Sequence, residues 1–149
     1  MKLLLTGIAG FIGCSLSKKL LREGNSIIGI DNFNDYYDIN LKRVRKESLG
    51  NDNSLRIIKI DLVDKTKLEE VFIQFKPTHV IHLAAQAGVR YSIDNPQAYV
   101  DSNLVGFMNI LESCRKYPVK HLIYASSSSV YGGNRSEEHT SELQSLSHL

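Results

Sequence analysis

A glycine-rich segment, residues 6–13, constrains the fold of this chain more than any other, because it reads Thr-Gly-Ile-Ala-Gly-Phe-Ile-Gly. A short apolar run, residues 3–5, precedes it, and Ile12, Leu16 and Leu20 follow with the spacing of one helix face. A strand, a glycine-rich turn and a helix form the phosphate-binding part of a dinucleotide-binding unit. The turn lets the backbone approach a pyrophosphate, and the helix start supplies free N–H groups. The segment therefore predicts a dinucleotide site.

The spacing of the three glycines, Gly7, Gly10 and Gly13, is G-x-x-G-x-x-G rather than G-x-G-x-x-G, and glycines also occur in turns that bind nothing. The next apolar run, residues 26–30, strengthens the interpretation because it ends at Asp31. A carboxylate there accepts hydrogen bonds from ribose hydroxyls and repels a 2′-phosphate, which favours NAD over NADP. The alternative is that Asp31 is a turn residue that caps the next segment.

Apolar runs and segments of helical period alternate along the rest of the chain. Such alternation, with right-handed crossovers, predicts an α/β fold with a doubly wound (Rossmann) parallel sheet in the order 3-2-1-4-5. We expect its strands at residues 3–5, 26–30, 55–60, 79–85 and 121–125.

The longest predicted helix begins at Asn95, an N-cap that is followed by Pro96 at the first helical position. Asn103 lies beside the apolar stripe of this helix and should be at least half-buried. The stripe itself should consist of Val100, Leu104, Phe107, Leu111 and Cys114.

Composition excludes several classes of protein. The net charge is only +2, and the densest basic run, residues 42–46, is interpreted as the solvated face of a helix, so we expect no nucleic-acid partner. No apolar stretch approaches membrane-spanning length. Cys14 and Cys114 fall in predicted helices and are typical of a reducing compartment, so a cytoplasmic protein is expected. His79 and His82 lie three apart on a strand and face opposite ways, so no metal site is expected.

Five motifs together resemble an extended short-chain dehydrogenase/reductase of the NAD-dependent epimerase/dehydratase group, and most of all a UDP-glucuronate 4-epimerase. The resemblance spans about residues 1–133 and implies that tightly held NAD⁺ oxidises C4 of a bound UDP-sugar. The 4-keto sugar then turns over and receives the hydride on its other face, so that UDP-glucuronate and UDP-galacturonate interconvert. The motifs are residues 6–13, 31–37, 82–92, 95–103 and 126–132.

The resemblance also implies roles for individual residues. Ser127 corresponds to the catalytic serine or threonine that bonds the sugar O4, and Ser128 to a substrate contact, although a plain serine-rich loop is the alternative. Arg90 is a candidate counter-charge for the sugar carboxylate, or else bonds phosphate or a neighbouring subunit. The implied cofactor-binding residues are Gly7, Gly10, Phe11, Ile12, Gly13, Asp31, Asn32, Asp61, Leu62, Leu83, Ala84, Ala85 and Asn103.

One comparison within the group rests on chemistry. The 4,6-dehydratases that this sequence resembles carry Thr-Asp-Glu before Val-Tyr-Gly, and those carboxyl groups act as acid and base in the elimination of water. Residues 127–129 are all serine here. Hydroxyl groups of ordinary pKa do not replace carboxyl groups in this role, so dehydration is disfavoured.

The end of the chain departs from the pattern. The group's base is the tyrosine of a Tyr-x-x-x-Lys motif, and no tyrosine of this chain has a lysine four residues later. Residues 135–149 turn abruptly to serine and glutamate and resemble the translated reading frame of a sequencing-library adapter. We expect residues 1–134 to be a Rossmann domain truncated before its last strands and its substrate domain, and residues 135–149 to be a non-native tail, disordered or a short helix. The alternative is a natural tail.

Two functions of different kinds follow. The first is the amino-terminal NAD-binding part of a UDP-sugar 4-epimerase, for which a homodimer of the whole protein is left open. The second is a dinucleotide-binding fragment without turnover, which is expected of the 149 residues as printed. An epimerase for another nucleotide sugar, such as UDP-glucose, is the remaining alternative, because only residues 86–92 indicate a uronate substrate.

Overall fold

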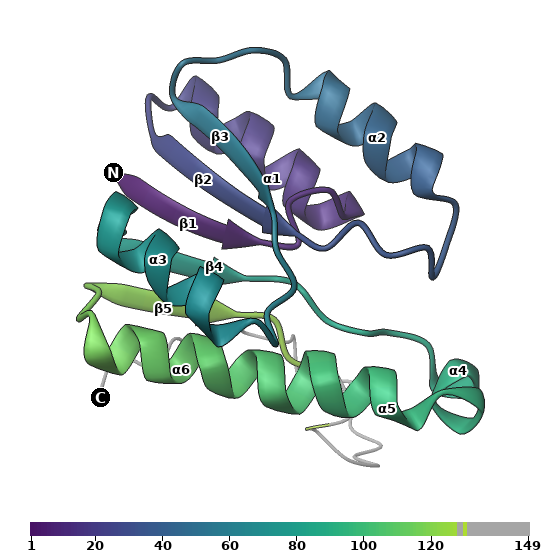
Figure 1. Ribbon diagram of the computed structural model, residues 1–149. Coiled ribbons are helices and arrows are strands. Elements are labelled where there is room, and N and C mark those ends of the chain that lie inside the picture. Colours follow the sequence, from purple (N-terminus) through teal and green to yellow (C-terminus); the bar gives the residue numbers. More distant parts are fainter. Residues whose placement is uncertain (128–129, 131–149) are drawn as a thin grey trace, which may run out of the picture.

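The computed structural model describes residues 1–127 and residue 130, and in this part of the chain strands and helices alternate (Figure 1). All strand pairs are parallel, and the sheet order is β3-β2-β1-β4-β5, which confirms the predicted doubly wound sheet. The predicted tail, residues 135–149, lies outside the described residues. The elements are β1 (Lys2–Thr6), α1 (Phe11–Arg22), β2 (Ser26–Asp31), α2 (Ile39–Ser48), β3 (Leu55–Lys59), α3 (Lys65–Phe75), β4 (His79–His82), α4 (Val89–Asp94), α5 (Pro96–Tyr99), the π-helix η1 (Val100–Gly106), α6 (Phe107–Lys116) and β5 (His121–Tyr124).

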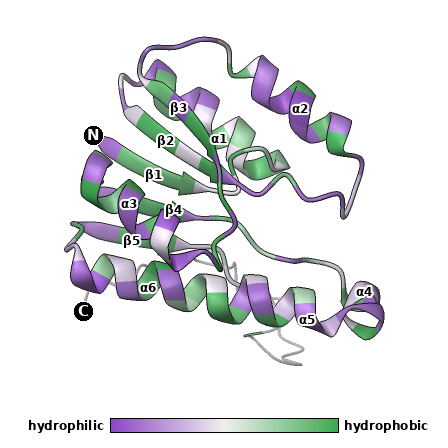
Figure 2. Cartoon of the chain, viewed as in Figure 1, coloured by the Kyte–Doolittle hydropathy of each residue, from purple (hydrophilic) through white to green (hydrophobic). Residues whose placement is uncertain are grey.

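Both faces of the sheet are covered, so the central strands are apolar on both sides, as Figure 2 shows. Leu4 of β1 points into a core with α3 and α6, which includes Phe72 and Ile110. Leu3 and Leu5 point the other way, into a core with α1. The alternation follows from the two-residue period of a strand, and it leaves the ends of the strands as the place for a ligand.

β4 is shorter than predicted. It ends at His82 rather than at residue 85. The N–H of Leu83 still donates to the carbonyl oxygen of Thr6, at 3.2 Å, whereas the N–H of Ala84 turns to the side-chain oxygen of Thr6, Oγ1, also at 3.2 Å. The chain then leaves the sheet as an irregular segment.

The long helix begins as predicted, because the side chain of Asn95 accepts a hydrogen bond from the N–H of Ala98. Its apolar stripe was predicted correctly only in part: Val100 is 40% exposed and Leu104 is 64% exposed, whereas Phe107 stacks on His82 and Cys114 packs against the core. Seven residues of this helix, those of η1, are π-helical. The buried positions lie on the neighbouring helix face, where Asn103 is half-buried and Gly106 and Ile110 are buried.

Two further features bear on the excluded classes of protein. In the described part of the chain, no helix is long and apolar enough to cross a membrane. Cys14 is buried in α1 and Cys114 is half-buried in α6, where burial raises the pKa of its thiol to about 11. Both cysteines are free thiols that pack against apolar neighbours.

Candidate dinucleotide-binding cleft

An open cleft lies at the carboxyl ends of β1, β2 and β4. The chain crosses from one side of the sheet to the other between β1 and β4, and doubly wound folds bind their ligands at such a switch point. The residues that line the cleft are Gly7, Gly10, Ile30, Asp31, Asn32, Asn34, Tyr36, Tyr37, Lys42, Ile60, Asp61, Leu62, Leu83, Ala84, Ala85, Gln86, Ala87 and Ser102.

The glycine turn packs so closely that side chains would not fit. Gly7 has a φ of +73°, and a Cβ there would lie 2.9 Å from the backbone nitrogen of Ala84. A Cβ on Gly13 would lie 2.1 Å from the carbonyl oxygen of Gly7. Gly10 is the N-cap of α1. The first N–H groups of α1 have no acceptor one turn earlier in the helix, so they form the anion-binding end of the turn.

Asp31 lies at the end of β2 and is only 6% exposed. Its Oδ2 accepts a hydrogen bond from the N–H of Ala9 at 3.1 Å, and its Oδ1 accepts one from the N–H of Phe33 at 2.9 Å. The second bond is the turn-forming role that the sequence left as an alternative. The same carboxylate lines the cleft, so the turn role and a ligand role do not exclude each other.

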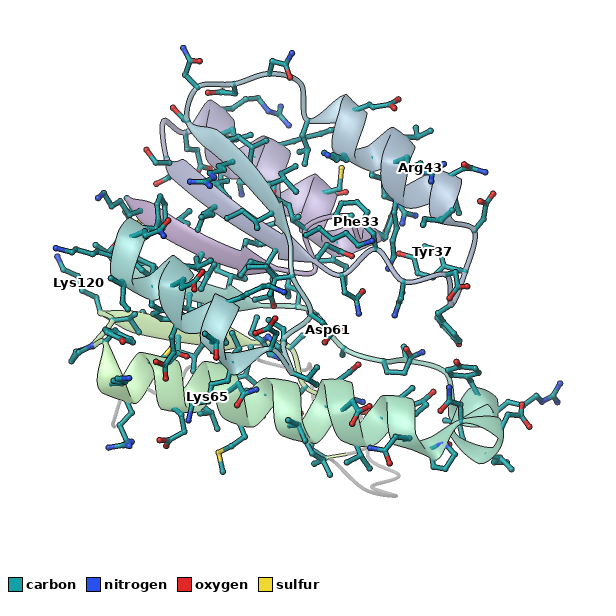
Figure 3. The ribbon with its side chains drawn as sticks, in the orientation of Figure 1. Phe33, Tyr37, Arg43, Asp61, Lys65 and Lys120 are labelled. Carbon is teal, nitrogen blue, oxygen red and sulfur yellow. The ribbon has the colours of Figure 1, made fainter. Side chains whose placement is uncertain are left out.

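The ends of β2 and β3 are joined by side chains. Asn32 Nδ2 donates to Asp61 Oδ2 at 3.0 Å, and Figure 3 shows Asp61 just beyond the end of β3. Leu62 is buried beside it and also lines the cleft. The N-cap of α3 is Asp64, whose side chain accepts from the N–H of Lys67 at 3.1 Å. Asp61 is therefore not used as a helix cap, and its side chain remains at the cleft.

The β4 side of the cleft depends on a buried pair, Thr6 and His82. Thr6 Oγ1 accepts from the N–H groups of Leu83 and Ala84, so we assign its proton to a bond with His82 Nδ1, at 2.8 Å. This assignment makes His82 neutral, with its proton on Nε2. Burial lowers the pKa of His82 to about 4, and its ring stacks on Phe107 with centroids 5.3 Å apart. His82 therefore has a packing role. In the described residues no group of three His, Cys, Asp or Glu side chains could hold a metal ion.

Asn103 holds the segment that follows β4. Its Oδ1 accepts from the N–H of Gln86 at 2.8 Å, and its Nδ2 donates to the carbonyl oxygen of Gln86 at 2.9 Å. Asn103 is half-buried, as predicted. Both ends of its amide are engaged by backbone, so in this structure it positions the cleft wall.

A cluster of tyrosines joins the two sides of the cleft. The ring of Tyr36, from the β2–α2 segment, lies 4.7 Å from that of Tyr91 in α4, centroid to centroid. Tyr99 donates to the carbonyl oxygens of Ala87 and Gly88. Gly88 has a φ of +97°, and a Cβ there would lie 2.1 Å from the Tyr36 hydroxyl. The close contact between the two segments therefore requires glycine.

The structure brings most, but not all, of the sequence-predicted site residues together. Phe11 and Ile12 are 74% and 62% exposed at the start of α1, Gly13 is buried beneath the turn, and none of the three lines the cleft. Ser127 and Arg90 are exposed outside the cleft, and Ser128 lies outside the described residues. The predicted residues that line the cleft are Gly7, Gly10, Asp31, Asn32, Asp61, Leu62, Leu83, Ala84 and Ala85.

Sequence reasoning missed one charged residue of the cleft. The run 42–46 was interpreted as a solvated helix face, and this is wrong for Lys42, which is only 5% exposed and lines the cleft. The available signal was position in the chain: α2 follows the segment that leaves Asp31, so one face of α2 must return to the end of β2. Charge alone suggested the opposite.

Comparison with known proteins settles the family. A sequence profile of the GDP-mannose 4,6-dehydratase family matches residues 4–147. The chain belongs to this family. Relatives that it resembles include Protein CapI of Staphylococcus aureus, which is 54% identical over 137 residues, and UDP-glucuronate 4-epimerase 4 of Arabidopsis thaliana, which is 50% identical over 132 residues. The predicted resemblance to the epimerase/dehydratase group is thus confirmed.

Solved structures of similar proteins agree with the fold. The UDP-glucuronic acid 4-epimerase of Bacillus cereus, solved in complex with UDP-glucuronic acid and NAD, superposes with a TM-score of 0.84 at 34% identity. It is matched over 98% of this chain and 46% of its own. The alignments span 92% of this chain and 41% of CapI, and 88% of this chain and 30% of the Arabidopsis protein. The chain therefore spans less than half of these family members.

Proposed function

We propose that this chain is the NAD-binding part of a UDP-sugar 4-epimerase that interconverts UDP-glucuronate and UDP-galacturonate. The observation that carries the proposal is the cleft itself, in which a glycine turn, a helix start and the Asp31 carboxylate meet at the switch point of the sheet. The names of the relatives support the same reading: family members at 46–50% identity are called UDP-glucuronate 4-epimerases.

The residues of the cleft fit a dinucleotide. Gly7 and Gly13 have no room for a side chain, so backbone can face a pyrophosphate at the turn. Asp31 presents a carboxylate where the ribose hydroxyls would lie, one strand away from that turn. Leu83, Ala84 and Ala85 provide an apolar wall with small side chains, over which the rest of the molecule would extend.

Bound NAD would supply the hydride acceptor and donor for C4 of the sugar. The hydroxyl proton would go to the group's base, the tyrosine of a Tyr-x-x-x-Lys motif, which the printed residues do not contain. Ser127 follows β5, which runs parallel to β4, so the residue lies at the carboxyl end of the sheet. Its hydroxyl would hydrogen-bond the sugar O4. Arg90, in α4, would offer a counter-charge to the uronate. Serine at residues 127–129 leaves no carboxyl group for dehydration.

Cofactor binding tests the proposal directly. We expect the purified 149-residue chain to bind NAD⁺ saturably in isothermal titration calorimetry, and Asp31→Ala to weaken binding about tenfold, because bonds to a charged acceptor contribute on the order of 1.5 kcal/mol. Asp52→Ala is the matched control, since Asp52 is exposed in the α2–β3 loop, outside the cleft. A folded chain that does not bind NAD⁺ would contradict the proposal.

An assay of turnover distinguishes the two functions that the sequence left open, part of an epimerase and a dinucleotide-binding fragment without turnover. Because the chain as printed has no Tyr-x-x-x-Lys motif, we expect no UDP-galacturonate when it is incubated with UDP-glucuronate and NAD⁺. Product in a nuclear magnetic resonance assay would contradict this expectation. UDP-glucose is the control substrate, because a UDP-glucose 4-epimerase from Thermus thermophilus also matches the fold, at 36% identity and a TM-score of 0.75.

A further inference from the structure

A buried lysine, Lys42, lies beside the candidate ribose carboxylate. Its Nζ is 2.6 Å from Asn34 Oδ1 and 3.5 Å from Asp31 Oδ1, and it lies 5.2 Å from the ring centroid of Tyr37. Figure 3 shows Tyr37 in the segment that leads into α2. The side chains of Lys42 and Asp31 are 7% and 6% exposed, so this ion pair is largely withdrawn from water.

A buried ion pair of this kind needs an explanation beyond stability. Removing two charges from water costs several kcal/mol per ion, and the mutual attraction often only offsets that cost. Arg45 shares the Tyr37 ring with Lys42, and its Nη1 donates to the Tyr37 hydroxyl at 3.2 Å and to the carbonyl oxygen of Ala9 at 3.5 Å. Because Lys42 and Asp31 both line the cleft, a ligand there would meet the pair.

The remaining hydrogen-bonding capacity of the pair is complementary. Asp31 uses its oxygens for the N–H groups of Ala9 and Phe33 and for Lys42, and a carboxylate has about four acceptor sites, so one remains. The ammonium of Lys42 has three donors, of which Asn34 and Asp31 take two. The cleft thus offers one acceptor and one donor side by side.

We propose that Lys42 is a specificity-determining residue that reads the adenosine ribose: its ammonium donates to one hydroxyl oxygen of the vicinal diol while Asp31 accepts from the other hydroxyl. This inference rests on the proposed binding of NAD. It also predicts how the site would treat the 2′-phosphate of NADP. Asp31 repels this phosphate, and Lys42 would bind it if Asp31 lost its charge.

The test compares nucleotides that differ only in one ribose hydroxyl. Calorimetry measures the affinities of ADP, 2′-deoxy-ADP and 3′-deoxy-ADP for the wild-type chain, for Lys42→Met and for Lys46→Met. Lys46 is the matched control, because it is an exposed lysine of the same helix and lies outside the cleft. We expect Lys42→Met to weaken ADP about tenfold. In that variant, one of the two deoxy-nucleotides should bind as well as ADP.

The outcomes distinguish a hydrogen bond from Lys42 to one ribose hydroxyl from an attraction between Lys42 and the whole nucleotide. If Lys42→Met weakens ADP and both deoxy-nucleotides by the same factor, Lys42 acts through its charge or through Asp31, and the inference is wrong. Lys46→Met should leave all affinities unchanged. Thermal unfolding without nucleotide establishes that each variant is folded. If the wild-type chain binds neither NAD⁺ nor ADP, the proposed function fails, and this inference fails with it.

Lys42→Met leaves the buried carboxylate of Asp31 without its cation, which can prevent folding. A second comparison therefore starts from Asp31→Ser, which removes that carboxylate. We expect Asp31→Ser to bind NADP⁺ about tenfold more tightly than the wild type, because Lys42 then faces the 2′-phosphate without a competing anion. The double variant Asp31→Ser with Lys42→Met should lose that gain. An Asp31→Ser chain whose NADP⁺ affinity is the same with and without Lys42 would overturn the inference.

Discussion

The two walls of the cleft are built by different physical means. The β1–α1 wall, residues 7–13, is formed by backbone in direct contact with backbone, and a Cβ on Gly13 would lie 2.1 Å from the Gly7 carbonyl oxygen. The β4 wall, residues 83–86, is held in place by hydrogen bonds between its backbone and side chains that are distant in sequence. Thr6 reaches Ala84, 78 residues later, and Asn103 holds Gln86, 17 residues earlier.

This difference shows which perturbations each wall tolerates. A wall of packed backbone has no space for added atoms but contains no group that titrates. A wall held by polar side chains has room for substitution, yet each lost partner leaves a buried polar group unsatisfied. The β1–α1 wall should therefore fail through steric clash, and the β4 wall through loss of hydrogen bonds or a change of pH.

The largest effect is expected from Gly13→Val, which tests the β1–α1 wall. The new side chain would meet backbone atoms of Gly7 and Ile8 within 3.0 Å, and neither can move without moving the turn. We expect the free energy of unfolding in urea to fall by more than about 3 kcal/mol. Lys19→Val, at an exposed position of α1, is the control for helix propensity. Equal losses in both variants would show that close packing is not the cause.

A smaller effect, with a defined pH window, is expected at His82 in the β4 wall. Burial lowers its pKa to about 4 in the folded chain, from an ordinary value of 6.5. The unfolded chain takes up a proton below pH 6.5, whereas the folded chain does so only near pH 4. Stability is therefore fully present above pH 6.5 and is lost as the pH falls, by about 3 kcal/mol at pH 4.

The measurement is urea denaturation of wild type and His82→Gln between pH 7 and pH 4. Carboxylates also titrate toward the acid end of this range, so the difference between the two proteins isolates the histidine. The difference should shrink by about 3 kcal/mol toward pH 4. A difference that stays constant across this range would mean that His82 is not buried in its neutral form.

The smallest effect is expected from Asn103→Ala, which removes one clamp of the β4 wall. The N–H and carbonyl groups of Gln86 lose their partners, and this should lower the free energy of unfolding by about 2 kcal/mol. Asn25→Ala is the control, because Asn25 also donates to backbone, at Leu20, but precedes β2 at the amino end of the sheet, away from the cleft. If Asn103→Ala weakens NAD⁺ binding and Asn25→Ala does not, the clamp positions the cleft wall.

Features that depend on residues close in sequence were predicted well, and features that depend on distant residues were not. The glycine turn, the carboxylate that ends β2 and the sheet order were predicted, because each depends on neighbours in sequence or on the alternation of strands and helices. The end of β4 was predicted too late, since the N–H of Ala84 turns to the side chain of Thr6, 78 residues earlier. The stripe of the long helix was only partly right, because the face of a helix that is buried depends on which distant residues cover it, as Leu62 covers Gly106.

The sequence by itself determined the architecture: apolar strands, glycine spacing and helix caps act over a few residues, and together they allow one doubly wound sheet with its cleft at the switch point. Only the tertiary structure decided the environment of the polar groups. Lys42 belongs to a run that is typical of a solvated face, yet it lies buried against Asp31. Burial and hydrogen bonding depend on which distant segments meet, and residue type alone does not specify that.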